Sequence, residues 1–140
     1  MNLHKKLNIV LDTNILLVSI PRQSKYHIIY KSLIEKKYNL FITNDILKEY
    51  EEILHRKYYP ETVEEIITSL FNLSNVFLVN PYFNWNLIEN DPDDNKFVDC
   101  AVAGNVDYII TNDNHFNILK DFGFPKVQTL KIDQFKELFE

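Results

Sequence analysis

The segment LNIVLDTN at residues 7–14 restricts the fold of this chain more than any other, because an apolar run ends there abruptly in Asp12, Thr13 and Asn14. Five apolar-rich residues in a row are typical of a strand that is buried on both faces of a parallel sheet. In open α/β sheets, ligands bind just beyond the carboxyl ends of the strands. Asp12 is therefore predicted to lie where such a fold carries out its chemistry.

A second segment repeats this pattern near the other end of the chain. In DYIITND, the mainly apolar segment from Tyr108 to Thr111 is followed at once by Asn112 and Asp113. If the two strands are central and parallel, their carboxyl ends lie at the same edge of the sheet. The sequence thus predicts that Asp113 lies beside Asp12.

Segments typical of strands and of helices alternate along the whole chain, as their apolar periodicity shows. Such alternation predicts an α/β fold in three layers, α/β/α, with a mainly parallel central sheet of about five strands. We expect a single domain over residues 1–140. The expected strands are 7–11, 40–42, 76–79, 108–111 and 127–130; the expected helices are 13–20 (capped by Thr13 or Asn14), 26–34, 46–59 (capped from Thr43, Asn44 or Asp45), 61–73, 94–103, 115–122 and one from 132.

Composition excludes several classes of protein. The chain has only two glycines, so it contains neither a Walker loop nor a dinucleotide-binding glycine motif. A net charge of −5 argues against binding nucleic acid through overall charge alone, which leaves a local basic patch or a bound cation to attract phosphate. No apolar run approaches the length of a membrane span, and a lone cysteine, Cys100, agrees with a reducing compartment, so we expect a cytoplasmic protein without membrane contact.

The late helix contributes a further acidic candidate. At about 100° per residue, Asp94 points toward the middle of the apolar face of this helix, although it also suits the first turn as a cap. Asp99 projects away from that face and is expected in solvent, with an outer metal contact as the alternative. Asp91 and Asp93 are assigned to turn chemistry in the preceding loop.

The helix after the second strand carries three glutamates. Helical projection places Glu52 opposite the apolar stripe and leaves Glu49 and Glu51 on its two borders. Periodicity alone does not choose between them.

Four acidic motifs in this order, LDTN, ILKEYEEIL, DPDDNKFVDCA and DYIITND, resemble the PIN-domain family of ribonucleases, and most closely its bacterial and archaeal branch of toxins from toxin–antitoxin pairs. The resemblance covers nearly the whole chain. It selects Glu49, because the family's acid follows two apolar residues and one spacer. The acidic quartet that it implies is Asp12, Glu49, Asp94 and Asp113, with Thr13, Asn14 and Thr111 as hydrogen-bonding support.

Electrostatics gives an independent reason to expect a metal ion at such a quartet. Two carboxylates about 5 Å apart repel each other by roughly 3 kcal/mol at an effective dielectric constant of about 20. A hard divalent cation relieves this repulsion, and oxygen ligands suit Mg²⁺ or Mn²⁺. No His or Cys stands in these motifs at a zinc-like spacing, and His115 is assigned to the start of a helix.

The resemblance implies that the chain is an endoribonuclease that hydrolyses RNA phosphodiester bonds by metal-activated water. Asp12, Asp94 and Asp113 are then expected as metal ligands, and Glu49 either as a ligand or as the group that orients the water. It also implies a cognate antitoxin that inserts a peptide or a basic side chain into the acidic cleft, and a homodimer. The expected phosphate contacts are Arg22, Lys25 and Lys96.

Two other functions use similar residues. One is a catalytically silent PIN-like module that binds RNA or protein, against which the retained acids argue. The other is a phosphatase-like or receiver-like domain, which also has acids at strand ends and needs a lysine near the end of a later strand. Lys126 and Lys131 flank the fifth strand, but LDTN lacks the paired acid two residues on.

Overall fold

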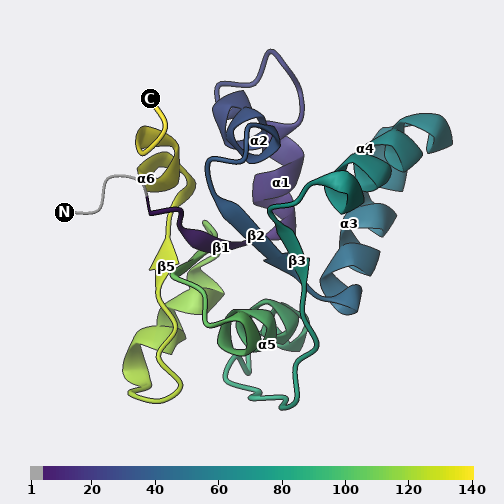
Figure 1. Ribbon diagram of the computed structural model, residues 1–140. Helices are drawn as coiled ribbons and strands as arrows, with labels where there is room; N and C mark the ends of the chain where they lie inside the picture. Colours follow the sequence, from purple (N-terminus) through teal and green to yellow (C-terminus); the bar gives the residue numbers. More distant parts are fainter. Residues whose placement is uncertain (1–4) are drawn as a thin grey trace.

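The computed structural model describes residues 5–140, and its core is a five-stranded sheet in the order β3-β2-β1-β4-β5 (Figure 1). Every pairing in this sheet is parallel. The predicted α/β class with a parallel central sheet is therefore confirmed. Residues 1–4 of the expected domain lie outside the described residues. The strands are β1 (Asn8–Leu11), β2 (Asn39–Ile42), β3 (Val76–Leu78), β4 (Tyr108–Ile110) and β5 (Thr129–Leu130).

Helices cover both faces of the sheet. Figure 1 shows α1, α2 and α6 on one side and α5 on the other, while α3 and α4 pack together as a pair. This arrangement confirms the predicted three layers. The helices are α1 (Thr13–Ser19), α2 (His27–Ile34), α3 (Asn44–Lys57), α4 (Pro60–Asn72), α5 (Asn95–Gly104) and α6 (Ile132–Glu137), and two 3₁₀ segments are η1 (Pro92–Asp94) and η2 (Asn114–Asp121).

β1 is the central strand, and its burial explains its sequence. Ile9, Val10 and Leu11 are fully buried between β2 and β4. The chain moves outward from β1 to β2 and β3, and then crosses to β4 and β5 on the other side. The strand order thus reverses between β1 and β4, and in open α/β sheets the ligand crevice lies at the carboxyl ends of such a pair.

Helix α3 is fixed against the end of β1 by one buried hydrogen bond. The Tyr50 hydroxyl donates to the Leu11 carbonyl at 2.6 Å, which brings the neighbouring Glu49 to the same edge of the sheet. The start of α3 follows the sequence prediction, because Thr43 caps it by accepting a hydrogen bond from the Ile46 N–H at 3.2 Å.

Two predicted helix starts are corrected. Asp12 is the residue that precedes α1, and Thr13 does not cap this helix because its hydroxyl donates to Glu49 of α3. Asp94 lies in η1, and α5 itself begins at Asn95. Within residues 5–140, no helix combines the length and the apolar character that crossing a membrane requires.

Candidate active site

Thr111 joins the carboxyl ends of β1 and β4. Its hydroxyl donates to Asp12 Oδ2 at 2.7 Å and accepts a hydrogen bond from the Asp113 N–H at 3.0 Å. Asp12 is only 9% exposed. Burial raises its pKa, the Thr111 hydrogen bond opposes this, and the charges of Asp113 and Glu49 raise the pKa further. The structure thus brings Asp12 and Asp113 to one site, as their positions after neighbouring strands predict.

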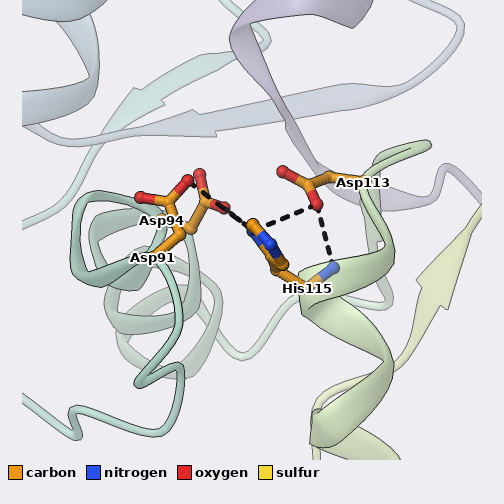
Figure 2. Close-up of side chains that lie close together, drawn as sticks. All are labelled: Asp91, Asp94, Asp113 and His115. Atoms are coloured by element: carbon orange, nitrogen blue, oxygen red, sulfur yellow. Dashed lines mark hydrogen bonds and ion pairs between the residues drawn. The ribbon is translucent and has the colours of Figure 1, made fainter.

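Two 3₁₀ segments, with the residue that precedes each, bring together four side chains that we call the four-residue cluster: Asp91, Asp94, Asp113 and His115. In Figure 2, Asp91 and Asp94 approach from one side, and Asp113 and His115 from the other. One ligand atom from each residue lies within 4.8 Å of the others. The Asp94 N–H donates to the Asp91 carbonyl at 3.0 Å, and the His115 N–H donates to Asp113 Oδ1 at 2.9 Å. Both turns therefore hold their side chains toward a common centre.

The carboxylate of Asp94 lacks compensation. Its Oδ2 atom is buried and has no hydrogen-bond partner among residues 5–140. Burial, together with the negative charges of Asp91, Asp113 and Asp12, raises the pKa of Asp94 to about 8. A buried carboxylate oxygen without a donor requires either a proton or a cation. This oxygen and its oxygen-rich surroundings fit a divalent metal ion.

Glu49 lies in a second group, here called the lysine-paired group, with Asp93 and Lys96. Lys96 Nζ lies 2.6 Å from Glu49 Oε1 and 3.0 Å from Asp93 Oδ1. Glu49 Oε2 accepts a hydrogen bond from the Thr13 hydroxyl, which links this group to the residue after Asp12. Both oxygens of Glu49 thus have partners, and Glu49 is not part of the four-residue cluster. Lys96, expected as a phosphate contact, is paired with these two carboxylates.

Asp99 corrects the expectation of a solvated face. It is only 7% exposed, and its Oδ1 accepts a hydrogen bond from the Trp85 N–H at 3.0 Å. Burial raises its pKa. The loop that follows β3 covers this side of α5, and a helical projection of α5 alone does not reveal such a cover.

A cavity of about 370 Å³ borders the acids on the α1 side. Asp12, Asn14 and Asp113 line it together with Tyr26. Lys25 Nζ lies 5.1 Å from the centre of the Tyr26 ring, which places this lysine near the cavity. Arg22 is exposed in the turn that precedes α2.

Two residues of the four-residue cluster were not expected from the sequence. The sequence predicts Asp91 in a turn of the loop and His115 at a helix start; the structure places Asp91 directly before η1 and His115 in the first turn of η2. The side chains nevertheless join Asp94 and Asp113. The available signal was spacing, because Asp91 stands three residues before Asp94 and His115 two residues after Asp113, both within single turns.

The chain matches a known family model and several solved structures. A family model described as PIN domain matches residues 8–115. Among solved structures, one chain of the crystal structure of VapBC2 from Rickettsia felis bound to a DNA fragment from their promoter aligns with a TM-score of 0.60 and 17% identity, over 89% of this chain and 98% of that chain. At this identity the alignment shows a common fold. No curated protein sequence matches the chain.

Proposed function

The chain belongs to the PIN-domain family, and from this premise we propose that it is a metal-dependent endoribonuclease that hydrolyses RNA phosphodiester bonds. The observation that carries the proposal is the buried Asp94 Oδ2, which has no hydrogen-bond partner among residues 5–140 and stands amid other carboxylates. Such an oxygen destabilises a fold unless a ligand compensates it. Binding of a cation would remove this destabilisation.

We propose Mg²⁺ or Mn²⁺ as the cofactor, held by Asp12, Asp94 and Asp113. When bound, such an ion supplies a water of lowered pKa and neutralises charge on the phosphate and on the leaving oxygen. Glu49 serves either as a further ligand or as the acceptor that orients the water. Its contact with Lys96 favours the orienting role, because that ion pair already compensates its charge.

The chain's own residues position these acids. Thr111 fixes Asp12 and Asp113 relative to each other, and Thr13 fixes Glu49. Asn14, exposed in the cavity that Asp12 lines, is proposed as a hydrogen-bond donor to RNA. The proposed phosphate contacts are Arg22, Lys25 and Lys96.

We propose further that the enzyme is the toxin of a toxin–antitoxin pair, acting in the cytoplasm as a single domain and as a homodimer. The resemblance of its four acidic motifs to the toxin branch supports this assignment, and its common fold with a chain of VapBC2 agrees with it. The proposed antitoxin places a basic side chain against the uncompensated acids, which is the charge that they lack.

The test is cleavage of a mixed pool of single-stranded and structured RNA with Mg²⁺, Mn²⁺ or EDTA. We expect cutting that EDTA abolishes. Asp12→Asn should reduce the rate by more than about a hundredfold, because even outer contacts of metal sites contribute about 10- to 100-fold. The matched control is Asp121→Asn, which neutralises an exposed aspartate at the end of η2 and should cut as the wild type does.

Metal binding is measured in parallel as a rise in melting temperature. If the wild type neither cuts RNA nor gains stability with Mn²⁺, the proposal is wrong, and the chain is a catalytically silent binding module. If Asp12→Asn and Asp121→Asn lose activity equally, the loss does not come from the site.

A further inference from the structure

The four-residue cluster contains a nitrogen that the oxygen-only quartet does not. His115 Nδ1 faces three carboxylates, at 3.4 Å from Asp113 Oδ1, 3.7 Å from Asp91 Oδ2 and 3.8 Å from Asp94 Oδ2 (Figure 2). The ring is therefore directed at the same centre as the buried Asp94 oxygen. Its side chain is 43% exposed, so the imidazole is reached from solvent while its Nδ1 atom faces inward.

These separations resemble those between ligands of one ion. Hydrogen bonds from nitrogen to oxygen are usually about 2.7 to 3.2 Å long, and all three contacts exceed that range. Atoms that share an octahedral cation at about 2.1 Å lie about 3 Å apart when adjacent and about 4.2 Å apart when opposite. The three contacts of Nδ1 fall between these two values.

Resting on the proposed function, which requires a divalent cation, we propose that His115 Nδ1 and the Asp91 carboxylate are ligands of that cation together with Asp94 and Asp113. The site then has mixed nitrogen and oxygen ligands. Imidazole suits first-row transition ions, whereas Mg²⁺ prefers oxygen ligands and gives up its water reluctantly. The site therefore selects a first-row transition ion, with Mn²⁺ as the probe, over Mg²⁺.

The backbone holds both added ligands in place before any ion binds. The η1 turn fixes Asp91 relative to Asp94 through the hydrogen bond between their main chains. Asp113 caps η2 by accepting the His115 N–H, so the same carboxylate that would bind the ion also orients the turn that carries the imidazole. This preorganisation reduces the entropy that must be lost when the ion binds.

A purely electrostatic role for His115 makes a different prediction. As a protonated counter-ion, the imidazolium would compensate one of the three negative charges and would compete with a metal ion. Removing it would then strengthen the binding of Mg²⁺ and of Mn²⁺ alike. As a ligand, its removal weakens Mn²⁺ and leaves Mg²⁺ nearly unchanged.

The first experiment measures Mn²⁺ and Mg²⁺ affinity by titration calorimetry on the wild type, His115→Ala, Asp91→Asn and Asp94→Asn. We expect the wild type to bind Mn²⁺ at least about tenfold more tightly than Mg²⁺, and His115→Ala to remove most of that preference. Asp91→Asn should weaken both ions, and Asp94→Asn should weaken both most strongly. His55→Ala, an exposed histidine of α3 at the groove toward α4, is the matched control.

The second experiment detects the nitrogen directly. Pulsed electron paramagnetic resonance of the Mn²⁺-loaded wild type should show coupling to a ¹⁴N nucleus, and His115→Ala should lack it. An unchanged Mn²⁺-to-Mg²⁺ ratio in His115→Ala, or coupling that persists in this variant, overturns the inference and leaves the metal-dependent nuclease standing. Failure of the wild type to bind either ion overturns the proposed function itself.

Discussion

The four-residue cluster and the lysine-paired group lie at the same edge of the sheet in opposite electrostatic conditions. Burial and neighbouring acids raise the pKa of Asp94 to about 8. In the lysine-paired group, a hydrogen bond from Lys96 lowers the pKa of Asp93. Burial disfavours the Lys96 ammonium, but its bonds to Glu49 and Asp93 outweigh this and raise its pKa. The same side-chain chemistry is thus stabilising in one group and destabilising in the other.

This contrast indicates that one group stabilises the fold and that the other is suited to bind a ligand. In the lysine-paired group, Lys96 compensates the charges of Glu49 and Asp93, so this group can stabilise the fold in the absence of any ligand. In the four-residue cluster, by contrast, the buried oxygen of Asp94 has no hydrogen-bond partner among residues 5–140. Functional sites commonly retain such uncompensated groups at a cost in stability.

The largest effect should come from pH acting on the four-residue cluster without metal. The ordinary pKa of Asp94 is 3.8 and its folded value is about 8, so the native state holds more protons than the unfolded state between these values. Stability therefore falls as pH rises through that window, by on the order of 3 kcal/mol between pH 5 and pH 8. Urea unfolding in EDTA at pH 5 and pH 8 measures this loss.

Asp94→Asn is the control for this prediction, because it removes the titrating group and should flatten the pH dependence. Saturating Mn²⁺ should flatten it too, since the ion takes the place of the proton. A metal-free wild type that is equally stable at pH 5 and pH 8 would show that the two groups do not differ as described.

A smaller effect should follow from breaking the lysine-paired group. Lys96→Met leaves Glu49 without its cation, and the two side chains are only 15% and 20% exposed. We expect the free energy of unfolding at pH 7 to fall by about 1 to 2 kcal/mol, less than for a fully buried pair. Adding Glu49→Gln to Lys96→Met should recover part of this loss. If Lys96→Met leaves the free energy of unfolding unchanged, the stabilising role of this ion pair is wrong.

The smallest effect should come from Asp93, whose contact with the same lysine lies at the surface. Its side chain is 76% exposed. Exposed ion pairs contribute about 0 to 1 kcal/mol, so Asp93→Asn should change stability by less than about 0.5 kcal/mol. Chemical unfolding of this variant beside Lys96→Met shows whether burial sets the order. A loss from Asp93→Asn as large as that from Lys96→Met would rule out this explanation.

The parts of the site that follow buried strands were predictable from sequence. Asp12 and Asp113 come directly after apolar runs, and a parallel sheet brings the ends of its central strands together. The choice of Glu49 came from family resemblance, since helical projection left two candidates. The structure shows which residues hold the Glu49 carboxylate in place, namely Thr13 and Lys96.

Errors arose where a partner comes from a distant segment. Asp99 is buried under the loop whose Trp85 N–H donates to its carboxylate. The Thr13 hydroxyl donates to Glu49 and does not cap its own helix. The sequence predicts local positions for His115 and Asp91, but the proximity of their side chains depends on how two separate turns face each other. Local periodicity cannot predict such contacts, because it describes only residues of the same segment.

The hydrogen bond between Thr111 and Asp12 spans 99 residues of sequence and has a consequence for the order of assembly. Contacts of such long range form only after the intervening chain has been brought together, and they slow folding. A nascent chain that ends before β4 carries Asp12 and Glu49 but lacks Asp113 and His115. Partial translation products therefore lack the assembled acidic site, which forms only after β4 has paired with β1.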